Sequence, residues 1–544
     1  MKYRTSRDSR TGEANNAVVL IVGSLVVIGG LSVFLFRLPD QAQVIPKVTA
    51  DDVAGGNGKN SSKDDGQPNK NTGKRSLVLY CAAGMKLPVE AAATKFTAET
   101  GIEVQLQYGG SGTLLSSLQI AKTGDLYLAA DTSYIEIARE KKVLSEAVAL
   151  ARMRPVIVVA KGNPKKIADI DDLLRSDVKF ALADPGAASV GKLTKKLLGQ
   201  SGQWDTVEKA AKVFVPTVNE ITNNVLTASV DAGIIWDSQV NQHPDELDMV
   251  RIPTFDAAVK EVTIGVLKWC ENSADALKFA RYLQAAEKGQ AEFEKFGFQT
   301  IPGDAWAEKP ELILYSGGVN RLAIQDTIAW FEQREGVRVN VVYNGCGILV
   351  GMINGSQHKQ PDAYFACDVS FMTQVQDRFR PALDVAHTNM VIITKRGNPK
   401  KINSAVDLAR EGLKVGVANP KESALGALTQ GLFETVKVGD SDLYTAMQPN
   451  ISVRTPTADL LVNQLMLSLD AAVVYQANLS EVLGKVEIIP IREGNSTAIQ
   501  PIAVGKQTKM PYLTQRLVDA LTSDVSRKRF LDVGFSWRAR LVAP

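Results

Sequence analysis

Three short turns in the first half of the chain consist almost entirely of small residues. They read CAAG (81–84), GGSGT (109–113) and PGAASVG (185–191), and each follows a segment that reads as a strand: LVLY, VQLQY and FALAD. Each also precedes a helical pattern, so each turn would open a helix. Helix N-termini present unpaired backbone N–H groups and a partial positive charge, which suit an anion. The chemistry indicated is capture of a compact anion by backbone N–H groups, with the Ser111 hydroxyl as a further donor.

Ser111 allows two interpretations. A serine at a helix start often caps the helix by accepting a backbone N–H, and a glycine after a strand is often only a turn residue. Taken alone, Ser111 fits the capping role better. The recurrence of small turns at three strand ends, and again in the second half of the chain, favours a binding site.

The sequence is duplicated internally. LVLY at 77–80 matches LILY at 312–315, and further blocks match in the same register. Near the end of each copy the displacement grows, where DAGIIW at 231–236 faces DAAVVY at 470–475. Several matching blocks in one order predict two homologous domains.

Each copy alternates β-branched apolar runs with helical patterns, which predicts an α/β fold with largely parallel strands. Ligands of such folds bind at the carboxyl ends of strands, where the small turns lie. About 230 residues per copy exceed one small α/β layer, so two lobes per domain are expected. The predicted domains are repeat 1 at 76–308 and repeat 2 at 309–544.

The N-terminal 75 residues differ in character. Residues 17–36 are apolar and uncharged, about the length that spans a bilayer. The basic segment 1–16 precedes them and is placed in the cytoplasm by the positive-inside rule. Residues 37–75 are rich in Gly, Asn, Ser, Asp and Lys and predict a flexible linker. We therefore expect a single-pass membrane anchor with both domains in the periplasm or outside the cell; a cleaved signal peptide is the alternative.

Composition and spacing argue against other classes of function. A net charge of +3 lacks the basic excess typical of nucleic-acid binding. The three histidines are far apart, without metal-ligand or acid–base spacing. We expect no enzyme, no catalytic residues, no metal and no cofactor. Cys81, Cys270, Cys346 and Cys367 lack C-x-x-C spacing and are compatible with two disulfides or with buried free thiols.

Three segments of repeat 1 resemble the periplasmic molybdate-binding proteins of ABC transporters. They are YGGSGTLLSSLQIAKTGDLYLAAD (108–131), LADPGAASVGKLTKKLLGQSGQWD (182–205) and DAGIIWDSQV (231–240). The resemblance covers repeat 1 and, more loosely, repeat 2. It implies tandem periplasmic-binding-protein (venus-flytrap) domains, each with its ligand between two lobes and an ABC transporter permease as partner.

The resemblance also implies ligand-contacting positions. In repeat 1 they are Ala83, Gly84, Ser111, Val190, Ile221 and Trp236. In repeat 2 they are Gly317, Gly318, Cys346, Leu425, Leu460 and Tyr475. The sequence departs from the family where Trp236 replaces a tyrosine, since an indole donates but cannot accept. It departs again at Cys346, because a thiol is a poor donor.

The expected function is capture of a molybdate- or tungstate-like oxyanion for ABC transport. Neutral donors suit a fully charged ion, whereas phosphate would need an acceptor for its proton. Asp184 and Glu220 either add coordination to the ion or serve as a turn residue and a first-turn charge. Asp459 would repel a dianion unless turned away, so repeat 2 either binds an anion or is structural. The alternatives are a membrane-anchored sensory or scaffold protein, or another anion such as sulfate or phosphate.

Overall fold

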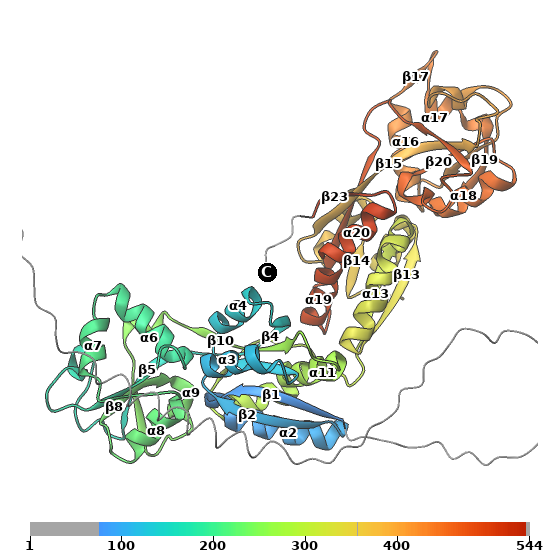
Figure 1. The fold of residues 1–544 in the computed structure, drawn as a ribbon. Coiled ribbons are helices and arrows are strands. Elements are labelled where there is room, and N and C mark those ends of the chain that lie inside the picture. The colour runs from blue at the N-terminus through green and yellow to red at the C-terminus, as the bar shows by residue number, and fades with distance from the viewer. Residues whose placement is uncertain (1–74, 356, 540–544) are drawn as a thin grey trace, which may run out of the picture. The chain divides into compact units, whose positions relative to one another are not determined.

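The computed structural model describes residues 75–355 and 357–539. This part of the chain contains two α/β domains in succession, each with two lobes (Figure 1). The predicted α/β class and the tandem arrangement are confirmed. No helix among the described residues is long and apolar enough to cross a membrane. The predicted tail and anchor, and nearly all of the predicted linker, lie outside the described residues.

Lobe A of repeat 1 is built on a six-stranded sheet in the order β11-β4-β10-β3-β1-β2. Strands β1, β2 and β3 are parallel, and β10 runs antiparallel to β3 and β4. The strands are β1 (Ser76–Ala82), β2 (Glu103–Gly109), β3 (Leu126–Ala129), β4 (Leu144–Met153), β10 (Lys260–Leu267) and β11 (Gln299–Thr300). The main helices are α2 (Lys86–Thr100), α3 (Ser111–Ala121), α4 (Thr132–Glu140), α11 (Ser273–Gln284) and α12 (Ala291–Lys295).

Lobe B of repeat 1 has a five-stranded sheet in the order β7-β6-β8-β5-β9. Its strands are β5 (Pro155–Ala160), β6 (Phe180–Ala183), β7 (Val213–Val215), β8 (Ala232–Trp236) and β9 (Leu247–Val250). Its helices include α6 (Ser189–Gln200), α7 (Trp204–Ala210), α8 (Val218–Leu226) and α9 (Asp237–Asn241). Every residue of β6 and β8 is buried, which is why both read as unbroken apolar runs rather than alternating ones.

Repeat 2 repeats this topology, but it adds a two-stranded sheet of β17 (Lys437–Val438) and β18 (Ser441–Asp442) and differs at the crossing between lobes. In repeat 1, Arg154 separates β4 from β5, whereas in repeat 2 the single strand β15 (Leu383–Lys395) pairs with strands of both lobes. Lobe A strands are β12 (Glu311–Gly317), β13 (Arg338–Asn344), β14 (Ala363–Phe365), β22 (Thr497–Val504) and β23 (Ser536–Trp537). Lobe B strands are β16 (Val415–Ala418), β19 (Ile451–Thr455), β20 (Ala471–Tyr475) and β21 (Val486–Pro490). The main helices are α13 (Arg321–Glu335), α14 (Cys346–Asn354), α15 (Val369–Thr373), α16 (Ala424–Glu434), α18 (Ala458–Leu467), α19 (Pro511–Leu521) and α20 (Asp524–Asp532).

Local signals end the first long helix of each repeat at the same place. Helices α2 and α13 are both closed by a glycine, Gly101 and Gly336, with φ of 71° and 64°. This left-handed conformation is open to glycine without steric cost, and it turns the chain back into the next strand. The equivalent glycines therefore support the duplication at the level of backbone geometry.

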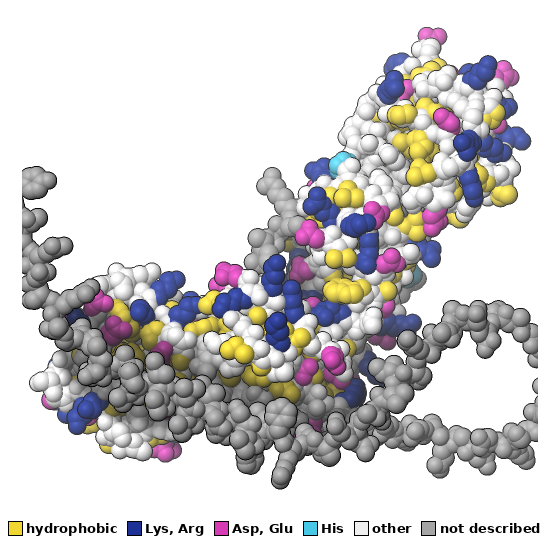
Figure 2. Space-filling model, in the orientation of Figure 1, with side chains coloured by type: hydrophobic (Ala, Val, Ile, Leu, Met, Phe, Trp, Pro, Cys, Tyr) yellow, Lys and Arg dark blue, Asp and Glu magenta, His cyan; other side chains and the backbone are white. Residues whose placement is uncertain are grey.

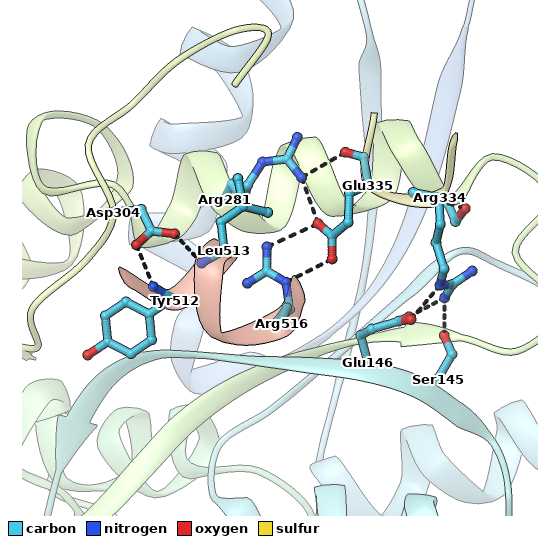
Figure 3. A network of polar contacts seen from close by, with 10 residues as sticks. Ser145, Glu146, Arg281, Asp304, Arg334, Glu335, Tyr512, Leu513 and Arg516 are labelled. Carbon is cyan, nitrogen blue, oxygen red and sulfur yellow. Dashed lines mark hydrogen bonds and ion pairs between the residues drawn. The ribbon is translucent and has the colours of Figure 1, made fainter. Parts of the chain in front are cut away.

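A polar network joins residues of the two repeats (Figure 3). Glu335, at the end of α13, accepts from Arg281 Nη1 of α11 at 3.0 Å and from Arg516 Nε of α19 at 2.8 Å. The side chains of Arg281 and Glu335 are only 4% and 3% exposed. Arg334 pairs with Glu146 of β4 in the same region. The two guanidinium groups compensate the buried carboxylate of Glu335. Removing any one of these groups would leave a buried charge without its partner, which is costly.

Charged side chains are distributed over the visible face of both repeats. Figure 2 shows Lys and Arg interspersed with Asp and Glu on this face rather than gathered into one single-signed surface. This distribution agrees with the small net charge of +3. The face lacks the continuous basic stripe that would follow a nucleic-acid backbone.

Candidate functional site

The predicted turns of repeat 1 come together around one small cavity between lobes A and B. Its volume is about 20 Å³, more than the roughly 10–15 Å³ that one water molecule requires. Drug-sized ligands occupy roughly 300–1,000 Å³, so a cavity of this size suits only a compact group. It is lined by Ala82, Ala83, Gly84, Gly109, Gly110, Ser111, Ala130, Ala188, Ser189, Val190, Thr217, Val218 and Trp236.

Three helices begin at the cavity: α3 from lobe A, and α6 and α8 from lobe B. Their first residues, Ser111, Ser189 and Val218, all line it. Among the described residues that line the cavity, none carries a charged side chain. The positive character of the cavity therefore comes from backbone N–H groups and helix dipoles.

Ser111 does not cap α3, because Gly110 is the capping residue and Ser111 is already the first helical residue. The side-chain oxygen of Ser111 instead accepts the backbone N–H of Ala130 at 3.1 Å. The residue is only 2% exposed. A hydroxyl that accepts one hydrogen bond keeps its own proton for donation. Ser111 is thus held with a donor available in the cavity, as the binding interpretation requires.

Five of the six positions predicted in repeat 1 line the cavity: Ala83, Gly84, Ser111, Val190 and Trp236. Ile221 does not line it. Ile221 lies one turn into α8, fully buried, and a Cβ on Gly233 would stand 2.2 Å from its Cγ2 atom. It therefore packs α8 onto β8.

The positions of α8 that reach the cavity are Thr217 and Val218, which the sequence reasoning missed. A usable signal was present, because Thr217 and Glu220 have the spacing of a capping box. The Thr217 hydroxyl donates to Glu220 Oε1 at 2.8 Å. Asp184 is likewise engaged locally, accepting the backbone N–H groups of Gly186 at 2.7 Å and Ala187 at 3.1 Å. Both carboxylates thus have the structural roles that were the alternative to coordination.

The two lobes of repeat 1 touch directly across the cleft. The backbone N–H of Gly112 donates to the carbonyl oxygen of Ala187 at 2.8 Å. A Cβ on Gly112 would stand 2.1 Å from the carbonyl oxygen of Gly186, so only glycine permits this approach. The GGSG turn is therefore shaped for lobe closure as well as for backbone donation.

Two amide side chains of lobe B also reach the first turn of lobe A. Gln239 Nε2 donates to the Gly84 carbonyl at 2.9 Å, and Asn219 Nδ2 donates to the Ala83 carbonyl at 3.3 Å. Because both amides hold the carbonyl side of this turn, they fix its position across the cleft.

Repeat 2 has the same backbone framework with different side chains. Cys346 is the first residue of α14, and its sulfur accepts the backbone N–H of Cys367 at 3.0 Å, just as Ser111 accepts that of Ala130. The backbone N–H of Gly347 donates to the carbonyl of Glu422 at 3.0 Å, matching the closure contact of repeat 1.

The other positions predicted in repeat 2 differ in what they contact. Gly317 adjoins the sulfur atoms of Cys346 and Cys367, and Gly318 faces Thr457 and Asp459. Leu425 is buried at the second residue of α16, and Tyr475 is buried at the end of β20. The Tyr475 hydroxyl has no hydrogen-bond partner within the part of the chain that the structure describes.

Leu460 lies on the solvent-facing side of α18. Its side chain is 42% exposed, whereas the neighbouring Leu461 is fully buried, as Ile221 is in repeat 1. Helices α8 and α18 both begin after a threonine with extended backbone, Thr217 and Thr457. The sequence separation of these two threonines is one residue larger than the separation of the equivalent strands β8 and β20. Repeat 2 then loses one residue before its next strand.

The correct register shows which residue of repeat 1 corresponds to Asp459. It aligns with Asn219, the amide that bonds the first turn of repeat 1. A Cβ on Gly318 would lie 3.7 Å from Asp459 Oδ1, so the carboxylate faces the equivalent turn. A carboxylate there opposes a dianion, where repeat 1 presents a neutral amide.

The cysteines are all free thiols in this structure, with Cys270 only partly buried. Among the described residues, no group of three or more His, Cys, Asp and Glu side chains is arranged to hold a metal ion. The arrangement at both clefts consists of backbone donors and small side chains.

Two α/β lobes that close over a small neutral cavity, formed where helices begin, define the class of two-lobed solute-binding proteins. The chain matches the family model of bacterial extracellular solute-binding proteins twice, over residues 77–299 and 312–536. It therefore belongs to that family and carries two tandem copies of its domain.

Several known proteins are similar to part of this chain. The chain is 28% identical over 229 residues to the molybdate-binding protein ModA of Mycobacterium tuberculosis, covering 42% of this chain and 85% of the relative. Among solved structures, the Azotobacter vinelandii periplasmic molybdate-binding protein matches at 15% identity and a TM-score of 0.36, covering 42% of this chain and 99% of that one. The Mycobacterium tuberculosis sulfate-binding protein SubI matches at 15% identity and a TM-score of 0.37, covering 42% and 86%. The resemblance to molybdate-binding proteins is confirmed.

Proposed function

We propose that the protein captures a small tetrahedral oxyanion of the molybdate and tungstate class in repeat 1 and presents it to an ABC transporter permease. The carrying observation is the Ser111 hydroxyl, held by Ala130 with its own proton unused, beside three helix N-termini. Membrane attachment through residues 17–36, with the domains outside the cytoplasm, is part of this proposal. The ModA relatives support the ligand class.

Binding would be coupled to closure of the lobes. Donors come from α3 in lobe A and from α6 and α8 in lobe B, so an anion satisfies both sets only when the cleft is closed. Its differential affinity for the closed state would draw the lobes together. A closed domain is the form that a permease could distinguish from the empty one.

The donor set also favours some anions over others. Phosphate keeps a proton near neutral pH and binds best where a carboxylate accepts that proton. The described residues that line the cavity include no carboxylate. We therefore expect phosphate to bind more weakly than molybdate, tungstate or sulfate.

The test is calorimetric titration of the full-length chain, kept in a mild detergent, with molybdate, tungstate, sulfate and phosphate. Tryptophan fluorescence follows the same titrations, with Trp236→Phe locating the signal. We expect saturable binding of molybdate or tungstate at one site per chain. Heat from none of the four anions would overturn the proposed ligand class, and preference for sulfate would change the substrate.

Matched serine variants locate the site within repeat 1. Ser111→Ala removes the donor in the cavity and should weaken binding by about 1.5–3 kcal/mol, roughly 10- to 150-fold, as expected for a hydrogen bond to a charged group. Ser117→Ala is the control, because Ser117 lies on the same helix, is exposed and bonds only the Thr113 carbonyl. Equal affinities of the two variants would exclude Ser111 from the site.

A further inference from the structure

The cleft of repeat 2 contains two thiols that have no counterpart in repeat 1. A Cβ on Gly317 would lie 2.1 Å from the sulfur of Cys367 and 3.1 Å from the sulfur of Cys346. Both sulfur atoms therefore crowd the same point beside Gly317. The Cys346 sulfur also accepts the backbone N–H of Cys367 at 3.0 Å, which fixes the two residues against each other.

We propose that Cys346 and Cys367 are a redox-active pair that forms a reversible disulfide in the repeat 2 cleft. The bond would tie the first turn of α14 to the segment that follows β14 within lobe A. It would also replace the thiol at the position where repeat 1 keeps its donor Ser111. This proposal does not depend on which anion repeat 1 binds.

The environment of the pair divides the chemical roles between the two cysteines. Burial opposes ionisation of Cys346, yet the hydrogen bonds that it accepts from Cys367 outweigh burial and lower its pKa. The pKa of Cys367 is raised, chiefly by its hydrogen bond to Cys346 and by burial. Cys346 is also the first residue of α14, where the helix N-terminus favours a thiolate. We therefore assign Cys346 as the attacking thiolate and Cys367 as the resolving thiol.

A small disulfide oxidant, such as oxidised glutathione, balances the reaction. The Cys346 thiolate attacks one sulfur of the oxidant, forms a mixed disulfide and releases one thiolate. Cys367 then loses its proton to solvent and attacks the Cys346 sulfur, which releases the second thiolate. Two electrons pass from the cysteines to the oxidant, whose two thiolates take up the protons that the cysteines lost.

The two cysteines of repeat 1 provide internal controls. Burial is the largest cause of a raised pKa at both cysteines, and the pKa of Cys270 is raised to about 12. Both thiols therefore resist forming the thiolate that exchange requires. Cys81 lies in β1 and Cys270 follows β10. A specific Cys346–Cys367 bond should leave both of them reduced.

The test uses the full-length chain equilibrated in glutathione redox buffer, followed by alkylation of free thiols and peptide mass spectrometry. A second sample is unfolded and refolded in the same buffer, so that burial of the thiols does not limit access. We expect one cross-linked peptide pair containing Cys346 and Cys367, loss of alkylation at both, and full alkylation at Cys81 and Cys270. Free Cys346 and Cys367 in both samples, or scrambled pairing, would overturn the proposal.

Single variants separate the two roles. Cys367→Ser removes the resolving thiol and should trap glutathione on Cys346. Cys346→Ser removes the attacking thiol and should leave Cys367 with less glutathione than Cys346 carries in Cys367→Ser, because burial still raises the pKa of Cys367. Cys270→Ser is the matched control and should keep the cross-link. Absence of the cross-link in Cys270→Ser would show that the pairing is not specific to the repeat 2 cleft.

Discussion

Replacing Gly112 by alanine should hold repeat 1 open and so weaken anion capture. In the closed domain the new Cβ would stand 2.1 Å from the carbonyl oxygen of Gly186, 2.8 Å from the Tyr134 hydroxyl and 3.1 Å from the carbonyl oxygen of Ala187. Real Cβ contacts essentially never fall below 3.0 Å, so the two lobes must separate locally. The nearest obstacle is backbone and cannot rotate away.

The magnitude follows from what the separation breaks. The hydrogen bond from Gly112 N–H to the Ala187 carbonyl, 2.8 Å long, contributes about 0.5–1.5 kcal/mol. Residual overpacking costs about 1–3 kcal/mol. The closed state should therefore lose roughly 2–4 kcal/mol, which corresponds to an affinity about 30- to 1,000-fold weaker, because the binding-competent state becomes a minor one.

The assay is calorimetric titration with the anion that binds the unaltered chain, together with X-ray scattering of free and loaded protein. Gly199→Ala is the control, because Gly199 lies in α6 of the opposite lobe and its Cβ would meet no atom within 4 Å. We expect the control to bind normally and Gly112→Ala to lose affinity while remaining folded. A folded Gly112→Ala with unchanged affinity would refute the closure argument.

Three further outcomes are expected. Glu335→Gln leaves Arg281 and Arg516 without their carboxylate and should cost about 3–5 kcal/mol, lowering the melting temperature by about 6–20 °C, whereas Glu261→Gln at an exposed pair should change little. Acid should act at the same place: burial opposes ionisation of Glu335, but the two arginines outweigh it and lower its pKa. The stability that this carboxylate contributes is therefore present above about pH 4.3 and is lost as pH falls through the lower folded pKa. Melting curves between neutral and acid pH should show this loss in the unaltered chain and not in Glu335→Gln; parallel curves would contradict it. Gly347→Ala would place a Cβ 2.1 Å from the Lys421 carbonyl in repeat 2, yet it should leave oxyanion affinity and stoichiometry unchanged, and a loss of binding would show that repeat 2 takes part in capture.

The class of fold could be predicted because its signals are local. Apolar runs such as β6 and β8 are buried along their whole length, so they read as strands in the sequence. The duplicated blocks extend the same strand prediction to repeat 2. Ser111 could be placed at the cavity between the lobes for a similar reason, since a helix that follows a strand must begin at the carboxyl end of that strand.

Register in repeat 2 was beyond the sequence argument. The match of DAGIIW to DAAVVY predicts Leu460 as the counterpart of Ile221, although repeat 2 has one residue fewer than repeat 1 between this helix and its next strand. This error moved the predicted contact to the exposed Leu460 and hid the match between Asn219 and Asp459. Only the packing of Leu461 in the core reveals the true register, because burial, unlike residue type, differs between the two leucines.

Local sequence patterns were enough to predict two α/β copies and the small turns where their helices begin, because hydrophobic periodicity and glycine at close approaches act over a few neighbouring residues. What those turns face became visible only in the folded chain. Gly112 meets Ala187 across the cleft, Asp459 faces Gly318, and the sulfur of Cys346 meets the backbone of Cys367. Each contact joins segments far apart in the chain, and its chemistry depends on distances that local patterns do not encode.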